Sequence, residues 1–524
     1  MSTRIQIKVI PEKKDDFIYH KKLVSIELGC NPDEIYSINL LKRSIDARKR
    51  VIKYVLSYEV FFESVNTSET LSQTSYSDVS KAKNTVYIVG CGPAGLFAAL
   101  SCLQHGFKPV VFERGKDVRS RRRDIALLNK KGTVNVESNY CFGEGGAGTY
   151  SDGKLYTRSK KRGSVKKILD LLVKHGANND ITIDAHPHIG TNKLPTIIQD
   201  ITQTIIHFGG EVNFDSKLTN INVVGNKLES IEINHSTFFS TDHLILATGH
   251  SARDVYELLK SKKIQTKFKP FAIGVRIEHK QTLIDKLQYN QNPRSEYLPP
   301  SSYGLVFNNG SRSVYSFCMC PGGIVAPCAT DKDEVVTNGW SPSKRNNPHA
   351  NSGIVVEVGW NDVKEFHAHD SFAGLMFQQK IEKKCAQLGG GNQVVPAQRL
   401  VDFMDNKQSE SLPESSYKPG IKSVNLNKIF PEFIASTLKQ GFLNFNQKLN
   451  GFLTNEAVLH ACESRTSSPI RIPRNENFEH PDVLGLYPCG EGAGYAGGIV
   501  SAAIDGMKCV EAIHEKLVQQ PLSD

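Results

Sequence analysis

The sequence predicts an α/β protein organised around a Rossmann-like, dinucleotide-binding domain of three layers. Two stretches carry this prediction. The first, 85–113, has the pattern of a strand, a GxGxxG turn, a helix and a second strand. The second, 483–517, has the pattern of a strand, a glycine-rich turn and a long helix. Between them the chain is β-rich, which predicts an inserted domain.

The GxGxxG turn runs from Gly90 to Gly95. We expect Gly90 to make the tight turn, Gly92 to admit a pyrophosphate and Gly95 to let the helix pack closely on the sheet. Because a helix N-terminus favours anions, Pro93 and Ala94 are also expected at the cofactor. The alternative, a glycine-rich turn in an ordinary βαβ unit, is disfavoured because strand, glycines and helix are in register.

An acidic residue follows the second strand of this unit. Glu113 comes 18 residues after Gly95, where a carboxylate accepts hydrogen bonds from an adenosine ribose. Arg114 lies next to it and is included among the expected cofactor contacts. A later apolar strand, 241–247, ends in small residues that permit close approach to the adenosine half of the cofactor: Ala247, Thr248 and Gly249.

A glycine-rich loop follows one segment after the ribose acid. Positions 143–153 contain five glycines in eleven residues, too many for a regular helix or strand. The alternatives are a flexible turn and a loop that lets the backbone approach a ligand. Its place after Glu113 favours ligand contact, with Gly145 and Gly146 as the expected cofactor residues.

The domain organisation follows from changes in pattern along the 524 residues. We predict a small α+β domain of ferredoxin-like type at 1–63, because 4–10 and 51–62 alternate like strands around helical segments. A serine- and threonine-rich linker follows at 64–84. The dinucleotide-binding domain is predicted at 85–255 and 456–524, interrupted by a β-rich substrate domain at 256–455.

The composition narrows the class of protein. No window reaches the ~18 apolar residues of a membrane span, and the first residues lack an apolar signal core, so we expect a cytoplasmic protein without a membrane span. The 11 cysteines are scattered without metal-ligand spacing, which predicts reduced thiols and no metal site.

The formal charge of +10 lies largely in two basic runs, 114–131 and 154–167. Two interpretations stay open. The runs are a solvated helix face, or they form a docking surface for phosphates, a nicotinamide cofactor, nucleic acid or an acidic protein. The small N-terminal domain is the other candidate docking unit.

Nine stretches together resemble one known family. They are Gly90–Gly95, Phe142–Leu155 (FGEGGAGTYSDGKL), His186–Asn192, Arg276–His279, Ser316–Gly323 (SFCMCPGG), Thr337–Gly339, Pro396–Arg399, Glu463–Pro469 (ESRTSSP) and Gly490–Gly506. On these stretches the chain resembles a family of largely uncharacterised FAD-dependent dehydrogenases, NAD(P)/FAD-dependent oxidoreductases related to glutathione-reductase-like flavoproteins. The family pattern is nearer ETRTSSP, so Ser464 is a mild departure.

The resemblance implies non-covalent FAD, a two-domain flavoprotein core and a small N-terminal domain, but no substrate. It places Gly490 and Glu491 beside the ribityl chain and pyrophosphate. The amides of a helix start at Gly497, Gly498 and Ile499 would lie near flavin N1 and O2, where negative charge accumulates on reduction. The flavin ring is then expected between 143–148, 497–499 and the inserted domain.

The candidate catalytic residues lie in the inserted domain. His279, at the end of a predicted strand, is a candidate for proton exchange at the substrate, with a satisfied surface or core histidine as the alternative. Cys320 is the second candidate, and alternation along a strand predicts that Cys318 shares its face. The thiols are either redox-active, or they are structural or part of the substrate wall. Arg345 and Arg465 are candidates for binding an anionic substrate, with structural ion pairs as the alternative.

Three functions are compatible with these patterns. The leading one is an FAD-dependent oxidoreductase, a dehydrogenase of an unidentified small, anionic substrate. The alternative is a flavin-containing RNA- or protein-binding or modification factor. A nicotinamide dehydrogenase without flavin is disfavoured by the C-terminal glycine segment. No second GxGxxG follows, so electrons come from the substrate, from transient NAD(P)H or from a protein donor. The sequence leaves the substrate and the oligomeric state open.

Overall fold

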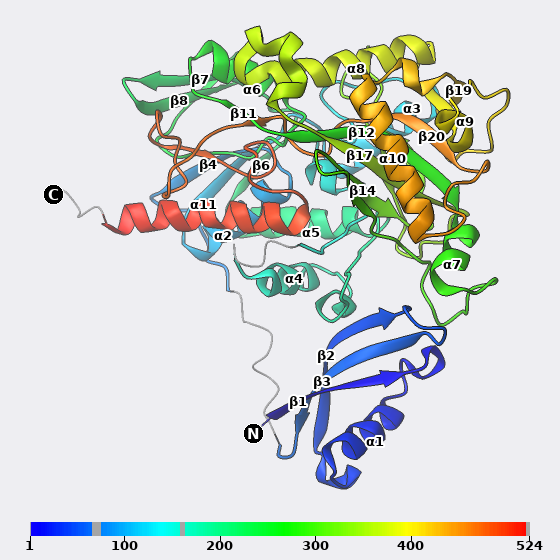
Figure 1. The fold of residues 1–524 in the computed structure, drawn as a ribbon. Coiled ribbons are helices and arrows are strands. Elements are labelled where there is room, and N and C mark those ends of the chain that lie inside the picture. The colour runs from blue at the N-terminus through cyan, green and yellow to red at the C-terminus, as the bar shows by residue number, and fades with distance from the viewer. Residues whose placement is uncertain (1, 65–74, 158–162, 520–524) are drawn as a thin grey trace.

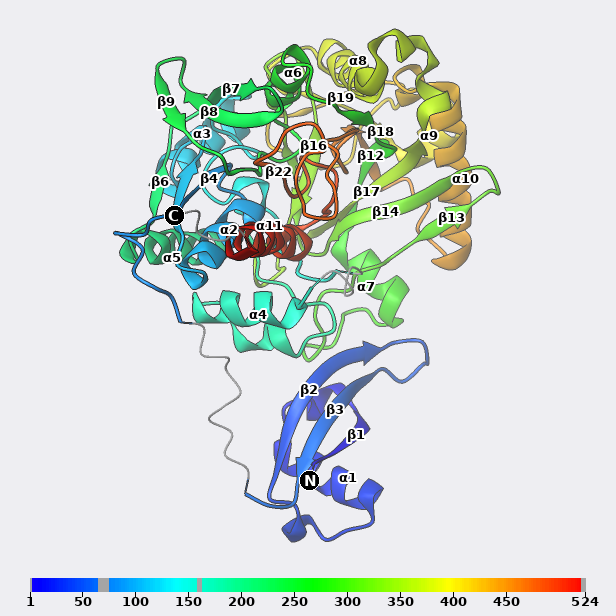
Figure 2. The ribbon, with the colours of Figure 1, turned by 90° about the vertical axis from the view of Figure 1, so that its left-hand side faces the viewer.

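The structure is a computed structural model, which describes residues 2–64, 75–157 and 163–519. A small N-terminal unit lies beside a larger body, as both ribbon views show (Figures 1 and 2). The body contains a parallel sheet at its centre and a larger mixed sheet next to it.

The central sheet has five parallel strands in the order β22-β10-β4-β5-β6. Its bounds are β4 (Thr85–Val89), β5 (Lys108–Phe112), β6 (Glu211–Asn213), β10 (Leu244–Leu246) and β22 (Leu486–Pro488). The GxGxxG turn connects β4 to α2 (Pro93–Gln104). The predicted βαβ unit is therefore present, and the C-terminal strand β22 joins the same sheet from the far end of the chain.

Helices cover one face of this sheet. They are α2, α4 (Val165–Lys174), α5 (Leu194–His207) and α11 (Ile499–Gln519). Apolar side chains of these helices share one core with Val86, Ile88 and Val111 of the sheet. Because side chains alternate along a strand, Val89 and Val110 point to the opposite face.

An antiparallel meander covers that opposite face. It consists of β7 (Leu218–Val224), β8 (Lys227–Ile233) and β9 (Thr237–Ser240), and α6 (Arg253–Ser261) packs beside it. Helices, parallel sheet and meander make the three layers that the sequence predicts.

The inserted region forms a seven-stranded sheet in the order β13-β14-β17-β12-β20-β18-β19. Its strands are β12 (Phe271–Lys280), β13 (Val306–Asn308), β14 (Ser313–Cys320), β17 (His349–Val358), β18 (Val395–Arg399), β19 (Ile421–Ser423) and β20 (Val458–Glu463). The predicted boundary at 455 assigns β20 to the dinucleotide-binding domain. That assignment is wrong, because β20 pairs with β12 and β18 inside the inserted sheet.

Further elements complete the body. The helices α7 (Gln281–Tyr289), α8 (Ala373–Gly389), α9 (Leu400–Met404) and α10 (Glu432–Lys448) accompany the inserted sheet. A two-stranded ribbon, β15 (Ile324–Pro327) with β16 (Thr337–Trp340), extends from the insert towards α3 (Val118–Lys131). A second ribbon pairs β11 (Lys267–Phe268) with β21 (Ile470–Arg471). Within the described ranges, no helix has the length and apolar composition needed to cross a bilayer.

The N-terminal unit is α+β, as predicted, but smaller than a ferredoxin-like sandwich. It has three antiparallel strands in the order β1-β3-β2 and one α-helix. The bounds are β1 (Ser2–Val9), α1 (Phe17–Leu28), β2 (Ser37–Asp46) and β3 (Lys53–Phe61). A second helix is absent from its described residues because Pro32–Glu34 forms only a 3₁₀ turn.

The N-terminal unit contacts the body through its second and third strands. The backbone of Arg43 pairs with Ile183 and Ala185, and the Tyr54 hydroxyl donates to the Tyr297 carbonyl at 3.0 Å. Of the predicted linker, 65–74 lies outside the described residues. In its second half Val79 is buried against the core and donates its amide to Phe208 at 2.8 Å.

Candidate functional site

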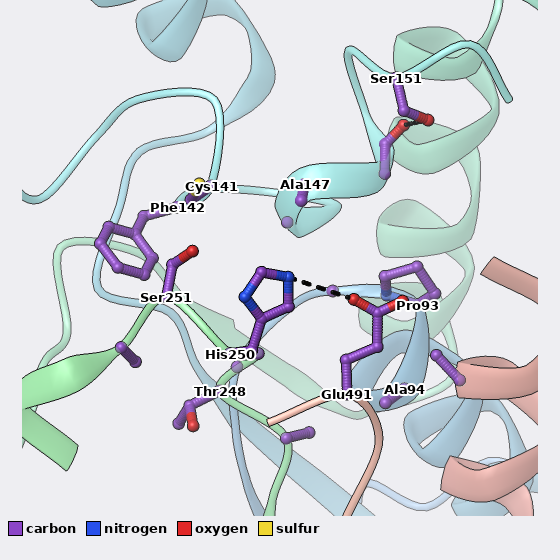
Figure 3. A pocket seen from close by; sticks show the side chains of 18 of the residues that line it. Pro93, Ala94, Cys141, Phe142, Ala147, Ser151, Thr248, His250, Ser251 and Glu491 are labelled. Atoms are coloured by element: carbon purple, nitrogen blue, oxygen red, sulfur yellow. Dashed lines mark hydrogen bonds and ion pairs between the residues drawn. The ribbon is translucent and has the colours of Figure 1, made fainter. Parts of the chain in front are cut away.

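A cavity opens where β4, β5 and β10 end, at the carboxyl edge of the parallel sheet (Figure 3). This edge is where ligands bind in open α/β sheets. The cavity is also walled by the glycine-rich loop, the inserted domain and the start of α11. Most of the predicted cofactor residues line it: Gly90, Gly92, Pro93, Ala94, Glu113, Arg114, Gly146, Ala247, Thr248, Gly249, Glu491, Gly498 and Ile499.

The remaining predicted residues, Gly95, Gly145, Gly490 and Gly497, flank lining residues without lining the cavity themselves. A Cβ added at Gly95 would lie 1.9 Å from the Gly90 carbonyl oxygen. This glycine therefore allows α2 to pack close to the turn, as predicted. Gly90 has φ 107°, and its added Cβ would lie 2.3 Å from the Ala247 carbonyl oxygen.

Three glycines of the cavity wall face open space instead. A Cβ added at Gly92 would have its nearest neighbour at 3.8 Å, and one added at Gly249 or Gly498 would meet nothing within 4 Å. Bare backbone at these positions leaves room for a ligand. At Gly92, the residue before α2, this room adjoins the first amides of the helix, which have no partner inside their own helix. The cradle thus fits a phosphate-bearing cofactor.

Glu113 is buried at the end of β5 and fastens two loops of the cavity. Its Oε1 accepts hydrogen bonds from the amides of Gly115 and Gly143, at 2.9 and 2.8 Å. Its Oε2 accepts from the Cys91 amide at 2.8 Å. A carboxylate oxygen can accept two hydrogen bonds, so Oε2 keeps one position for a ligand hydroxyl. Contact with a ribose stays a prediction that this geometry permits.

Arg121 organises the glycine-rich loop from beneath. The side chain is fully buried and donates to the carbonyls of Asn139, Tyr140, Glu144 and Gly146 at 2.7–3.0 Å. These bonds bring the loop carbonyls inward and leave its glycines at the cavity. In the sequence, Arg121 is one member of the basic run 114–131, and no local pattern distinguishes it from its exposed neighbours.

The rest of that basic run divides between internal pairs and solvent. Arg114 donates to Asp254 at 2.8 Å and stacks over the Phe142 ring at 4.3 Å. Lys116 pairs with Asp124 at 3.1 Å. The exposed members of the run are Arg119, Arg122, Arg123, Lys130 and Lys131. The solvated-face interpretation fits these five better than a continuous docking surface. In the second run, 158–162 lies outside the described residues.

The start of α11 differs from the open anion site that the resemblance implies. The Gly498 amide donates to the Glu491 carboxylate, so a side chain of the protein already occupies this helix start. His250 Nε2 lies 3.7 Å from the other oxygen of Glu491 (Figure 3). Burial raises the pKa of Glu491 and lowers that of His250 to about 4. His250 is therefore neutral at pH 7.

Lys154 supplies a cation at the end of the cavity bordered by the inserted domain. Its Nζ lies 3.1 Å from Asp152 Oδ2 and 3.5 Å from the Cys320 sulfur. Both Lys154 and Asp152 line the cavity, as do Cys318 and Asn338. Burial opposes the charge of Lys154, yet the Asp152 carboxylate holds its pKa above the ordinary value. The ammonium group is therefore permanent.

Asp152 has more cationic than anionic neighbours. Besides Lys154, Arg345 Nη2 lies 3.9 Å from Asp152 Oδ2, and His188 Nε2 lies 3.4 Å from Oδ1. Burial would raise the pKa of Asp152, but Lys154 and His188 hold it well below the usual range. Two permanent cations thus share one carboxylate, while burial lowers the pKa of His188.

The predicted catalytic residues are not at the cavity wall. His279 is 1% exposed, and its Nε2 lies 2.9 Å from the Phe452 carbonyl oxygen. Its position at the far end of β12, packed on the Phe452 ring, contradicts a role in proton exchange with substrate. Cys320 is also fully buried, and burial raises the pKa of its thiol to about 11. It lies behind the wall as an unreactive thiol.

The two cysteines of β14 do not share a face. A register shift falls between Phe317 and Cys320, and Cys318 has φ 45°. This β-bulge exposes Cys318 to the cavity and buries Cys320. The alternation rule fails here because the bulge adds a residue to the strand.

Neither predicted substrate arginine is free at the cavity. Arg465 lines it, but its Nη2 pairs with Glu334 at 2.8 Å and with Glu382 at 3.3 Å. Arg345 lies in a separate groove beside the N-terminal unit. Arg465 therefore forms structural ion pairs, which was the alternative to substrate binding. Lys154, a residue of the motif 142–155 that was not predicted as a site residue, lines the cavity with a cationic group.

Comparisons with known proteins agree with this arrangement. An uncharacterised protein of Clostridium beijerinckii is 41% identical over 524 residues, covering 96% of this chain and 97% of that one. A family profile described as "FAD-dependent protein, C-terminal domain-like" matches residues 270–466. The chain belongs to a family of FAD-dependent proteins. A second profile, "Domain of unknown function (DUF8436)", matches residues 1–61 of this FAD-dependent protein.

Solved structures with a similar course of the chain are more distant. The flavin-dependent brominase Bmp2 is 13% identical with a TM-score of 0.38, covering 84% of this chain and 80% of that one. The tetracycline destructase Tet(51) is 11% identical with a TM-score of 0.33, covering 83% and 82%. A geranylgeranyl bacteriochlorophyll reductase-like protein of Thermoplasma acidophilum is 13% identical with a TM-score of 0.34, covering 83% and 79%.

The family assignment identifies the cofactor as FAD, and the cavity fits it. The open glycine positions, the unpartnered amides at α2 and the free acceptor position on Glu113 suit a dinucleotide. The wall near β5 is apolar as well, through Phe112, Leu218, Ala252 and Val255, which suits an adenine ring.

Proposed function

We propose that this FAD-dependent enzyme is an oxidoreductase that acts as a dehydrogenase of a small anionic molecule. When bound, FAD supplies two-electron redox chemistry, and the protein supplies orientation and electrostatics. The proposal rests on the permanent ammonium group of Lys154 on the cavity wall. This group lies next to the Asp152 carboxylate, whose charge Arg345 already balances.

The charges around Asp152 favour an anionic substrate. Lys154 and Arg345 contribute two positive charges and Asp152 one negative charge, which leaves this group with a net charge of about +1 while the buried His188 is neutral. A substrate carboxylate or phosphate would complete the pairing of Lys154. The buried pair Arg276 and Glu463, at 3.1 Å behind the wall, is already neutral.

We place the substrate between the segment 146–154, the start of α11 and the bulge of β14. Residues of all three elements line the cavity. In this position Lys154 would bind the charged group of the substrate, and the amide of Asn338 would offer a polar contact. The bulge at Cys318 would shape the wall on the side of the inserted domain.

Two groups of the cavity wall, the Glu491 carboxyl and the His250 imidazole, qualify for proton transfer. Glu491 has a raised pKa and is 3.7 Å from the neutral His250. A neutral imidazole with a carboxyl partner can accept a proton from a substrate hydroxyl or amine. NAD(P)H as a transient donor is the alternative source of electrons, and it would enter the same cavity.

Anaerobic reduction of the purified holoenzyme tests this proposal. The flavin absorbance near 450 nm is followed while hydroxy acids, amino acids, phosphorylated metabolites, NADH and NADPH are added one at a time. We expect bleaching by at least one carboxylate or phosphate ester. In Lys154→Met, the half-saturating concentration of that compound should rise at least tenfold, whereas exposed Lys364→Met should behave like the wild type. Bleaching only by neutral compounds, or an unchanged half-saturation in Lys154→Met, would contradict the proposal.

A further inference from the structure

Two thiols from distant parts of the chain meet at the cavity wall. Cys141 lies in the loop after α3, and Cys328 directly follows β15 of the inserted domain. Their sulfur atoms are 3.7 Å apart although the residues are 187 positions apart in sequence. Both residues line the cavity, and Figure 3 shows Cys141 on the loop that borders it.

The surroundings of the pair make one thiol acidic and keep the other protonated. The S–H of Cys328 and the charge of Arg465 lower the pKa of Cys141 to about 6. The same contact, together with burial, raises the pKa of Cys328 well above its ordinary value. Cys141 is partly exposed, whereas Cys328 is 7% exposed and packs in a small apolar cluster.

Other cysteines of the described chain lack this combination. Cys489 lies beside Cys509, and Cys462 beside Cys385, but all four are fully buried and none lines the cavity. Cys318 is exposed in the cavity, yet its thiol lies away from bulk water among protein atoms, which raises its pKa. An acidic thiol with a second thiol in contact, on an accessible wall, is found at Cys141 and Cys328.

We propose that Cys141 and Cys328 form a peroxide-reactive dithiol site that closes into a disulfide. The Cys141 thiolate attacks one oxygen of hydrogen peroxide, an S–O bond forms, the O–O bond breaks, and the leaving hydroxide takes a proton to become water. The Cys328 sulfur then attacks the sulfenic acid, an S–S bond forms, the S–O bond breaks, and the Cys328 proton leaves with the hydroxide as a second water.

The disulfide would join two walls of the FAD cavity covalently. Cys141 is two residues before Gly143, whose amide binds Glu113, and Cys328 belongs to the β15–β16 ribbon of the inserted domain. The site does not depend on the substrate proposed above, because its chemistry requires only the two thiols and peroxide.

Peptide mapping of the holoenzyme tests the site. The protein is treated with an equimolar amount of hydrogen peroxide, free thiols are blocked with N-ethylmaleimide, and unreduced peptides are analysed by mass spectrometry. We expect a linked Cys141–Cys328 peptide pair that dithiothreitol separates. In Cys328→Ser, Cys141 should be trapped by dimedone as sulfenic acid, and Cys318→Ser should form the disulfide like the wild type.

Two results would overturn the proposal. One is a wild-type map without the linked pair after peroxide treatment. The other is oxidation that falls on Cys318 or another cysteine while Cys141 stays alkylated. The wild-type map is decisive by itself if Cys328→Ser fails to fold.

Discussion

Glu113 is expected to bind a ribose, and in the structure its carboxylate already binds backbone amides of the cavity wall. The sequence predicts a ribose acceptor, and the structure adds three backbone amides that the same carboxylate holds. A residue that fixes the loops around a ligand and also contacts that ligand is expected to be sensitive even to isosteric substitution, because an amide nitrogen cannot accept a hydrogen bond.

We expect Glu113→Gln to bind FAD about 5- to 150-fold more weakly, the equivalent of about 1–3 kcal/mol for an unpaired buried polar group. Equilibrium titration of the apoprotein with FAD measures the effect. Glu229→Gln, at an exposed position of β8, is the matched control. Equal affinity in the two variants would remove Glu113 from the cofactor site.

His279 is a structural residue with a predictable pH signature. Burial lowers its pKa from 6.5 to about 4, so the folded protein keeps it neutral while the unfolded chain protonates it near pH 6.5. The unfolded state then binds more protons, and stability falls as the pH drops from 6.5 towards 4. The slope is at most about 1.4 kcal/mol per pH unit for this site.

His279→Gln should flatten that slope by up to the same amount and should retain FAD. Urea unfolding at pH 7, 6 and 5 measures the slope, with exposed His235→Gln as the control. Retention of the full wild-type slope would mean that His279 does not titrate as its surroundings indicate.

At the scale of elements, the two glycine-rich helix starts belong to helices that touch each other. A Cβ added at Gly506 of α11 would lie 2.0 Å from the Ala94 carbonyl oxygen of α2. We expect Gly506→Ala to push the helices apart, lower the free energy of unfolding by about 1–3 kcal/mol and weaken FAD binding. Gly304→Ala, where an added Cβ meets nothing within 4 Å, should be neutral in the same denaturation experiment. Equal free energies of unfolding for Gly506→Ala and Gly304→Ala would show that close packing of α11 on α2 does not stabilise the protein.

The sequence predicts elements well where the signal is local. The βαβ unit at 85–113 and the strand and helix predicted at 483–517 follow from periodicity and glycine positions within short windows. The missing information concerns long-range pairing. Pairing between strands decides the central position of β20, the bulge at Cys318 and the fold of the N-terminal unit. No local sequence pattern encodes which strands pair.

The same limit applies to the site. The gathering of the glycine motif at the cavity wall was predictable, because the spacing of its glycines has a physical reason. Arg121 and the Cys141–Cys328 contact were not, because a buried arginine and a surface arginine look alike in sequence, and two cysteines 187 positions apart give no sign of contact. Lys154 was inside a quoted motif, but its charge gains meaning only next to Asp152 and Arg345.

At the scale of the whole molecule, the candidate cofactor cavity is assembled from segments spread over most of the chain. Its wall is formed in part by the GxGxxG turn, the glycine-rich loop, the β15–β16 ribbon and the start of α11. The C-terminal segment reaches this cavity because β22 pairs with β10 in the parallel sheet. Cofactor content therefore reports directly on whether the described arrangement is the functional one.

The decisive measurement is the FAD content of the purified, folded protein. Acid precipitation should release about one FAD per chain into the supernatant, identified by its fluorescence and mass, and leave no flavin on the pellet, because the family is FAD-dependent and the cavity offers a non-covalent cradle. A folded protein that is colourless, and that gains no absorbance near 450 nm when FAD is added and the excess removed, would contradict the account.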